Sequence, residues 1–504
     1  MKTILTLLLT ISFSALLPAR TDRPNIIFLL ADDQAVMAAG CYGNKDLRTP
    51  NIDKLAADGV RFVHHYDTTS ICMASRCSVM TGLYEYRHGC NFSHGDLERK
   101  FIEKSYPVFL RKAGYFTGFA GKIGFELKGE PFAAFAPLFD EWAGGPGQTF
   151  YETEKNAGIA RYASRYPHSS RAYGAWALDF FKAAKASGKP FCMSISFKAP
   201  HMPYRPDPID LKLYAVRKFH RPANFGVENG RQLSPQVHTS RAATSYREWV
   251  NDYDATVSKY YALVAGLDTA VGMIRQGLAS EGLDRNTVII FTSDNGYNAG
   301  SHGFGDKVIP YEESSNAPLI IYDPRLPGEL AGRICKGLTA NVDMAPTILA
   351  FASVPAPADI DGKSLLPLIA DSGARVRDSL PLFNFWGIPS AQSMAVVTPE
   401  WKYIDWYYGG GMKPTEELFH LRGDRLEMVP LANSPGYADQ LKTMRGIYDR
   451  ELAALKAKVV PGHGYESYPM LFDRGISWDR KAPLLDAHKA GRVKRKAGKK
   501  AGAS

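Results

Sequence analysis

The sequence has few cysteines, no internal repeat and no long apolar run beyond its first twenty residues. Six cysteines in 504 residues are too few for a fold that disulfides hold together. The lack of a repeat excludes a solenoid, and the lack of a second long apolar run argues against stable insertion into a membrane. Hydrophobic residues make up 45% of the chain. This length and composition favour one large α/β domain with an appendage, or two to three smaller domains.

The first twenty residues are typical of a cleaved export signal. Lys2 gives a positive start, residues 4–17 are largely apolar, and Ala19 is a small residue near which a signal can be cut. A membrane anchor is the alternative, but the apolar run is short for a bilayer span. No cysteine follows it, which argues against a lipoprotein. We therefore expect residues 1–20 to be removed and the protein to be exported, to the periplasm or the extracellular space.

The formal net charge of +10 is unevenly distributed. Seven lysines and arginines lie between Lys489 and Lys500, with glycine and alanine among them. Such a segment is typical of a disordered tail, which we place at residues 481–504. A nucleic-acid-binding arm is the alternative, but the export signal argues against it, so we expect no nucleic-acid partner. The rest of the chain is mildly basic, which suits an anionic substrate.

Continuous apolar runs alternate with helical patterns along residues 21–380, which we take as the main domain. Four of these runs are typical of buried parallel strands, and they lie at residues 25–31, 191–197, 287–292 and 318–322. The clearest helical pattern covers residues 256–278. The alternation predicts an α/β fold in which helices cover both faces of a mostly parallel sheet.

The pattern changes at about residue 381. Short aromatic and β-branched runs follow, with a predicted strand at residues 418–421 and an amphipathic helix at residues 439–456. We interpret residues 381–480 as a smaller α+β subdomain.

Polar clusters follow three of the predicted strands. Asp32-Asp33 follows the first, Lys198-Ala-Pro-His201 the second and Asp294-Asn295 the third. Ligands of such sheets gather at the carboxyl ends of the strands, so these clusters should lie together. The two acidic clusters would form an all-oxygen site suited to Ca²⁺ or Mg²⁺ rather than Zn²⁺. A solvated turn explains Asp32-Asp33 alone, but not a second acidic pair at another strand end.

Cys72 lies just ahead of a predicted helix at residues 75–82. Free N–H groups at a helix N-terminus favour an anion. Arg76, one turn into the helix, can reach back to the same point with a forked donor. For Cys72 alone the alternative is a buried or disulfide-bonded cysteine, and the surrounding pattern favours a functional residue.

Cys72-Met-Ala-Ser-Arg76, followed by Met80-Thr81-Gly82, resembles the signature of the type I sulfatases, Cys-x-Pro/Ala-Ser-Arg followed by Leu/Met-Thr-Gly. The commoner form has proline where this chain has Ala74. Other motifs fall in family order, at residues 24–33, 49–53, 121–122, 200–203, 292–296, 343–347 and 361–365. The resemblance covers roughly residues 24–435. It implies an alkaline-phosphatase-like fold with a small C-terminal subdomain.

The resemblance implies that a separate maturation enzyme oxidises Cys72 to formylglycine. It also implies a cation, Ca²⁺ rather than Mg²⁺, that residue 72 itself contacts and whose other ligands are Asp32, Asp33, Asp294 and Asn295. The hydrated aldehyde is a gem-diol, one hydroxyl of which attacks the sulfur. The second hydroxyl then regenerates the aldehyde and expels sulfate. A serine has only one oxygen and cannot perform this last step.

Roles for the basic residues follow from the same resemblance. Arg76 would hold the gem-diol, and Lys122 would bind sulfate oxygens. His201 and Lys307 would bind the sulfate ester and protonate the leaving oxygen. Taken singly, these residues are ordinary surface lysines or a core histidine; the motifs around them favour function.

Two further side chains are expected to contact the substrate. His302 lies in a Gly-Ser-His-Gly stretch near the Asp294 loop, and Arg205 can pair with a uronate. Exported sulfatases of this kind act on sulfated polysaccharides or their oligosaccharides, so the expected partner is a sulfated glycan.

The sequence departs from the family at Gly124. The family usually has a histidine two residues after the lysine, where it assists the gem-diol collapse, and residues 95–167 contain no histidine. Either another group takes this role, or the step is slower, or the metal-bound geometry suffices. The candidate replacements are His64, His65 and His302.

Two other functions fit part of this pattern. A phosphomonoester or phosphonate ester hydrolase of the same superfamily can also use formylglycine, but phosphatases of this fold more often use two zinc ions, and one all-oxygen cation site is evident here. The absent histidine leaves room for a non-catalytic sulfoglycan-binding relative. The presence of Cys72, Arg76, Lys122 and His201 argues against it.

Overall fold

The structure, a computed structural model, describes residues 23–215, 217–371 and 373–485. The predicted signal at residues 1–20 and residues 486–504 of the predicted tail lie outside the described residues. Among the described residues, no helix is both long and apolar enough to cross a membrane. All six cysteines are described, and none of them forms a disulfide.

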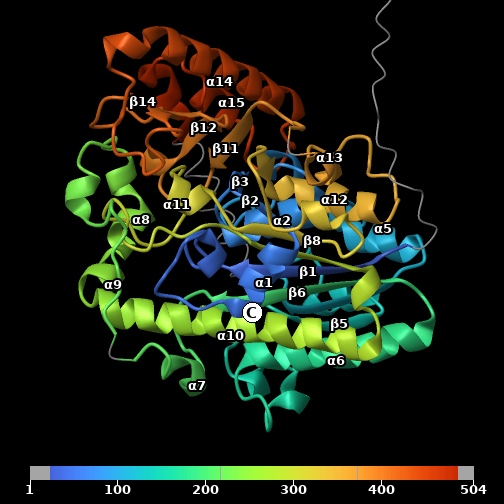
Figure 1. The fold of residues 1–504 in the computed structure, drawn as a ribbon. Helices are drawn as coiled ribbons and strands as arrows, with labels where there is room; N and C mark the ends of the chain where they lie inside the picture. The colour runs from blue at the N-terminus through green and yellow to red at the C-terminus, as the bar shows by residue number, and fades with distance from the viewer. Residues whose placement is uncertain (1–22, 216, 372, 486–504) are drawn as a thin grey trace, which may run out of the picture.

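An eight-stranded sheet forms the centre of the larger part of the chain (Figure 1). Its strand order is β5-β4-β6-β1-β7-β8-β2-β9. The strands are β1 Asn25–Asp32, β2 Val60–Phe62, β4 Phe116–Lys122, β5 Glu141–Gly145, β6 Phe191–Pro200, β7 Thr287–Ser293, β8 Leu319–Tyr322 and β9 Arg333–Cys335. Strands β5, β4, β6, β1 and β7 run parallel to one another, so the predicted mostly parallel sheet is confirmed.

The direction predicted for the fourth apolar run is wrong. The predicted strand at residues 318–322 is present as β8, but β8 pairs antiparallel with both β7 and β2. A continuous apolar run reports that both faces of a strand are buried, and it carries no information about the direction of the strand.

Helices cover both faces of the sheet, as the alternation of the sequence predicts (Figure 1). One face packs on α1 Pro50–Asp58, α6 Ser169–Ser187 and α10 Tyr253–Glu281. The other face packs on α2 Cys72–Thr81, α5 Tyr106–Lys112 and α12 Met344–Phe351. Successive residues of β1 contact opposite layers, Ile27 and Leu29 the first and Ile26 and Phe28 the second. Every residue of β1 is buried, which explains its unbroken apolar sequence.

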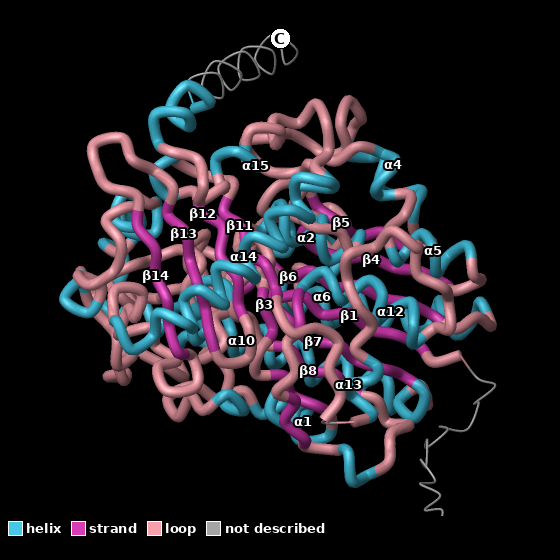
Figure 2. Tube along the Cα trace, turned by 90° about the horizontal axis from the view of Figure 1, so that it is seen from above, coloured by secondary structure: helices cyan, strands magenta, loops and turns pink. Residues whose placement is uncertain are grey.

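The C-terminal part is a four-stranded antiparallel sheet covered by one long helix (Figure 2). Its elements are β11 Leu380–Asn384, β12 Ser393–Val397, β13 Trp401–Trp406, β14 Thr415–His420 and α14 Ala438–Lys458. One face of the sheet packs on α14, and the other packs on the larger part of the chain, for example on Tyr66 and Tyr311. The predicted strand at 418–421, the helix at 439–456 and the α+β character of this subdomain are confirmed.

The remaining elements are short and lie mainly in the connections between these layers. They are β3 His65–Tyr66, β10 Thr339–Ala340, α3 Glu85–His88, α4 Arg99–Ile102, α7 Pro208–Leu211, α8 Arg241–Ser245, α9 Arg247–Val250, α11 Glu312–Ser315, α13 Leu366–Ala370 and α15 Tyr468–Leu471.

A buried carboxyl group joins the two parts of the chain and makes stability depend on pH. Glu85 Oε1 accepts hydrogen bonds from Asn91 Nδ2 at 2.7 Å and from the hydroxyl of Tyr465 at 2.5 Å. Burial raises the pKa of Glu85 to about 7. Since this folded-state pKa lies above the unfolded value, the stabilisation is complete below the unfolded pKa and is lost as the pH rises through about 7.

We therefore expect the unfolding temperature of the wild type to fall between pH 5 and pH 8, in part because of Glu85. Glu85→Gln removes this titration, so the variant should lose less stability over the same range, the difference being on the order of 3 kcal/mol. Thermal unfolding at a series of pH values measures it. Parallel curves for the two proteins would contradict the assignment.

Candidate active site

The polar clusters predicted at the strand ends meet at the carboxyl edge of the sheet. Asp32 ends β1, Lys122 ends β4, and His201 directly follows β6. Asp294 and Asn295 directly follow β7. Since β4, β6, β1 and β7 are neighbours in this order and run parallel, their carboxyl ends bring these side chains to one place.

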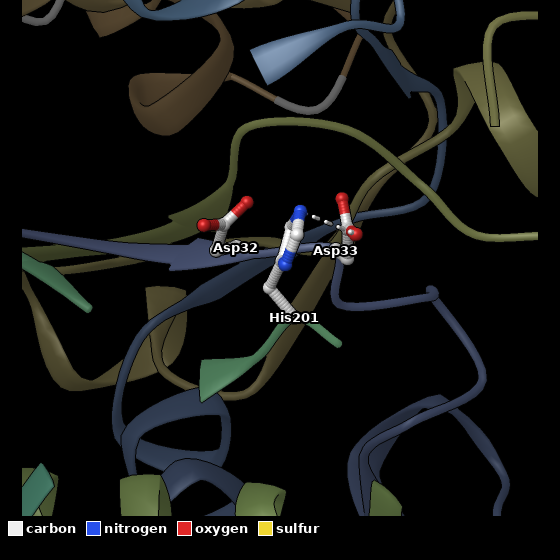
Figure 3. Close-up of side chains that lie close together, drawn as sticks. All are labelled: Asp32, Asp33 and His201. Carbon is white, nitrogen blue, oxygen red and sulfur yellow. Dashed lines mark ion pairs between the residues drawn. The ribbon is translucent and has the colours of Figure 1, made fainter. Parts of the chain in front are cut away.

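Asp32 and Asp33 lie at the centre of this cluster, with His201 facing them (Figure 3). One ligand atom from each of these three side chains lies within 4.8 Å of the other two. The backbone N–H of Asp33 donates to Asp294 Oδ1 at 3.2 Å, and Asn295 Nδ2 donates to Asp33 Oδ1 at 2.8 Å. Four of the five predicted ligand residues, Asp32, Asp33, Asp294 and Asn295, are therefore brought together, and His201 joins them.

Two oxygens of this cluster are buried without a hydrogen-bond partner among the described residues. They are Asp32 Oδ1 and Asn295 Oδ1. A buried oxygen without a donor is costly, and a hard cation that prefers oxygen ligands would satisfy both. The carboxylate and amide oxygens present therefore fit a divalent cation of the Ca²⁺ or Mg²⁺ kind.

The helix α2 places Cys72 and Arg76 against this cluster. The helix begins at Cys72 itself, so the expectation that Cys72 lies ahead of a helix starting at residue 75 is wrong. Both side chains are almost fully buried, with 3% and 2% of their surface exposed. Arg76 Nε donates to Asp294 Oδ2 at 2.8 Å, and its Nη1 donates to the carbonyl of Lys122 at 2.9 Å and to the hydroxyl of Ser196.

Two lysines donate to the central carboxylates. Lys122 Nζ lies 2.5 Å from Asp32 Oδ2, and Lys307 Nζ donates to Asp33 Oδ1. Burial alone would raise the pKa of Asp32, but the facing cations, led by Lys122, lower it well below its ordinary value. Burial also opposes the charge of Lys307, yet Asp33, and after it Cys72, raise its pKa well above the ordinary value. Asp32 and Lys307 are therefore charged, and Lys307 interacts electrostatically with Cys72, whereas burial raises the pKa of Asp294 to about 6.

His201 is oriented by a backbone carbonyl. Its Nδ1 lies 2.5 Å from the carbonyl oxygen of Met202 and donates to it. This leaves Nε2 facing the cluster, 3.7 Å from Asp33 Oδ2 (Figure 3). Burial lowers the pKa of His201, against the attraction of the two aspartates. The ring can thus present one nitrogen to a bound molecule in a fixed direction.

Gly124, where the family usually has histidine, lies against Arg76. A Cβ atom at residue 124 would lie 2.4 Å from Arg76 Cδ, and the backbone there has φ +82°. The guanidinium stem therefore fills the space that a side chain at position 124 would need. A side chain at position 124 would therefore require Arg76 to move.

Three histidines were predicted as substitutes for the one missing at position 124. Among the described residues, none of the three forms a hydrogen bond or an ion pair with the cluster. His64 is bonded by Arg425, and His65 by Thr339. His302 is buried, and its ring nitrogens are bonded to the carbonyl of Asn229 and to the Asn224 amide.

Arg205 also lies apart from the cluster. It is 64% exposed and pairs with Glu152 at 3.1 Å. The proposed substrate contacts of His302 and Arg205 therefore stay predictions, and the cluster itself contains neither residue.

Lys198 is a residue that the sequence argument left without a role. It lies in β6 three residues before His201, it is 6% exposed, and its Nζ donates to the carbonyl of Gln148 at 3.2 Å. Burial lowers its pKa, while the charge of Asp32 works in the opposite direction. Its place in the polar segment at the end of a predicted strand was the signal that could have identified it.

A family profile described as Sulfatase matches residues 24–354. The chain belongs to the sulfatase family. A second profile, described as the C-terminal part of N-sulphoglucosamine sulphohydrolase, matches residues 300–455 of the sulfatase. The match thus covers both the large sheet and the C-terminal subdomain, and the sulfatase is a sulfuric ester hydrolase.

Known relatives agree with this assignment. N-acetylglucosamine-6-O-sulfatase of Bacteroides thetaiotaomicron is 27% identical to the sulfatase, over 84% of this chain and 85% of the relative. A solved structure described as a complex with its substrate D-glucosamine-2-N,6-O-disulfate has a TM-score of 0.71 and 25% identity, over 86% of this chain and 99% of that chain. The phosphonate monoester hydrolase of Agrobacterium radiobacter has a TM-score of 0.70 and 21% identity, over 87% and 96%, and shares the fold. The alkaline-phosphatase-like fold is confirmed.

Proposed function

We propose that this sulfatase is exported and removes sulfate from the amino-sugar units of a glycan. A 6-O-sulfated glucosamine is the first substrate to test. The observation that carries the proposal is the cluster of Asp32, Asp33 and Asp294 with Arg76 and Lys307, the two cations that interact electrostatically with the buried Cys72. The relatives named above support the choice of sugar, since one is an N-acetylglucosamine-6-O-sulfatase and one is bound to a disulfated glucosamine.

Two groups would complete the site. A Ca²⁺ ion held by Asp32, Asp33, Asp294 and Asn295 would supply positive charge beside the sulfate and favour the deprotonated nucleophile. Formylglycine at position 72, formed by a maturation enzyme, would supply a hydroxyl nucleophile and a second hydroxyl for regeneration.

The side chains of the chain itself would bind and orient the ester. Three carboxylates face Arg76, Lys122 and Lys307, so a bound divalent cation would leave the site with a net positive charge that suits an anionic sulfate. Lys122 and Lys307 would bind the sulfate oxygens as the charge on these oxygens redistributes during transfer. His201 Nε2, fixed in direction by the carbonyl of Met202, would face the leaving oxygen and would protonate it from the imidazolium form, which a bound anionic sulfate ester favours.

The direct test is sulfate release from a panel of sulfated mono- and oligosaccharides by protein produced together with a maturation enzyme. Release from 6-O-sulfated glucosamine, detected as inorganic sulfate, supports the proposal. Turnover of phosphate or phosphonate esters without release from any sulfate ester would overturn it.

Removal of divalent cations should abolish most activity and lower stability. We expect dialysis against a chelator to reduce kcat at least about 100-fold. Returning Ca²⁺ should restore it and raise the unfolding temperature, because an ion that binds only the folded state stabilises it by about 2.7 kcal/mol at 100 times its Kd. Asp33→Asn should lose this thermal response, which is read without any substrate. An unfolding temperature that Ca²⁺ and Mg²⁺ both leave unchanged would contradict the cation site.

Lys198→Met should lower kcat/KM for sulfate esters about 10-fold or more, because a buried positive charge at the edge of the cluster is removed. Lys189→Met is the matched control, since Lys189 is exposed and precedes the opposite end of the same strand. Steady-state kinetics compare the two variants. Equal activities would show that neither the charge of Lys198 nor its bond to Gln148 contributes to turnover.

A further inference from the structure

A cavity of about 310 Å³ lies outside the catalytic cluster, between α9, the start of α10 and residues 35–46. Its lining includes four aromatic residues, Trp249, Tyr253, Tyr260 and Tyr261, together with smaller apolar residues. Small-molecule sites are usually concave spaces of about 300–1,000 Å³ in which aromatic surface is combined with a few polar groups. The cavity has the size of a site for one small ring rather than for a long chain.

One tyrosine connects this cavity to the catalytic cluster. Tyr260 lines the cavity, and its hydroxyl donates to the carbonyl of Asp33 at 2.7 Å and accepts from the N–H of Ala35 at 2.9 Å. The same side chain therefore borders the cavity and fixes the backbone of a predicted metal ligand. A molecule in the cavity would lie one aromatic side chain away from the cluster.

The polar part of the lining carries unpaired positive charge. Among the described residues, the side chains of Arg221 and Lys45 have no hydrogen-bond or ion-pair partner, although both line the cavity. The only lining carboxylate, Asp46, is paired with His220 at 3.0 Å. The guanidinium of Arg221 lies over the ring of Tyr253, 4.8 Å from its centroid, so its position is fixed without neutralising its charge.

The aromatic wall suits the flat apolar face of a sugar ring, which packs well on aromatic side chains. Trp249 is 1% exposed, and its indole N–H is buried without a partner among the described residues. Because that nitrogen has almost no accessible surface, Trp249 would contribute apolar contact to a bound molecule rather than a hydrogen bond.

We propose that this cavity binds an anionic sugar unit of the glycan, next to the unit that is desulfated. The ring lies against the aromatic wall, and its carboxylate or sulfate faces Arg221 and Lys45. This inference rests on the proposed function, because it assumes that the substrate is a glycan longer than one sugar.

Binding is tested first with a protein that cannot turn over, Cys72→Ala, so that the result does not depend on catalysis. Calorimetric titration uses two sulfated tetrasaccharides, one containing hexuronate and one with its carboxyls reduced. In this background, Lys45→Gln with Arg221→Gln should raise the Kd of the hexuronate-containing chain about 10-fold, and less at high salt. The matched control is Lys212→Gln with Arg217→Gln, which removes the same charge from exposed residues outside the cavity lining.

The outcomes separate this inference from the proposed function. An effect confined to the hexuronate-containing chain identifies a carboxylate as the bound group, and an effect on both chains identifies a sulfate. Equal Kd values for the cavity variant and the control, or no binding of either chain, would overturn the inference. In matured protein, the cavity variant should lose kcat/KM on tetrasaccharides mainly through KM, and much less on a sulfated monosaccharide. Failure of the matured wild type on every sulfate ester would instead count against the proposed function.

Discussion

Cys72→Ala is expected to lower kcat for sulfate esters at least about 10⁴-fold, because it removes the proposed precursor of the nucleophile. The side chain is 3% exposed at the first position of α2, where the dipole and free N–H groups of the helix favour an anion. Removal of one sulfur from a buried site should cost little stability beyond about 1–2 kcal/mol. The measurement is sulfate release together with thermal unfolding.

Cys77→Ala is the matched control for this experiment. Cys77 lies on the same helix and is also fully buried, but it belongs to the hydrophobic layer on the other side of the cluster. The Cys77→Ala variant should lose about as much stability as Cys72→Ala but should keep the turnover of the wild type. Mass spectrometry of the Cys72 peptide establishes in parallel whether the wild-type residue has been converted. Substantial activity in Cys72→Ala would rule out the proposed nucleophile.

Gly124→Ala is expected to lower kcat/KM about 100-fold or more, by displacing Arg76. The new Cβ would lie 2.4 Å from Arg76 Cδ, and that side chain holds Asp294 Oδ2 at 2.8 Å. Misplacement of a buried guanidinium at a charged site is costly, since transition-state stabilisation depends on its position. Gly124→His, which introduces the residue usual in the family, should fail for the same reason. Steady-state kinetics and thermal unfolding measure both variants.

Gly129→Ala controls for the backbone conformation. Gly129 has φ +75°, close to that of Gly124, but a Cβ there would meet nothing within 4 Å. It therefore carries the same left-handed strain without the contact to Arg76. If Gly124→Ala and Gly129→Ala lose the same activity, the contact with Arg76 has no catalytic role.

The sequence was informative where burial determines the pattern. β1, β6 and β7 are buried on both faces, and their unbroken apolar runs identified them and placed Asp32, His201 and Asp294 at one edge. The antiparallel direction of β8 cannot be recognised from its sequence, because the run is apolar in either direction. The start of α2 was also missed, because its N-cap residue, Ile71, makes no side-chain capping bond that would mark the boundary.

The site was predictable as a set of residues but not as an arrangement. The strand-end argument brings the carboxylates and lysines together, yet no one-dimensional pattern relates Gly124 to Arg76, which are far apart in sequence and touch in space. For the same reason, His302 and Arg205 were expected near the cluster, whereas their hydrogen bonds and ion pairs are made to other loops. The aromatic cavity is likewise lined by segments that are distant in sequence, and no sequence pattern predicts that they meet.

The burial of α2 limits the period during which another enzyme could reach Cys72. All ten residues of the helix are buried, and they pack under strands and helices that come from much later in the chain. If Cys72 is converted as proposed, the oxidising enzyme would need access before these later segments close over it. Conversion and folding would then compete, so slower folding of the C-terminal elements would increase the converted fraction, whereas a folded but unconverted molecule would stay inactive until it unfolds.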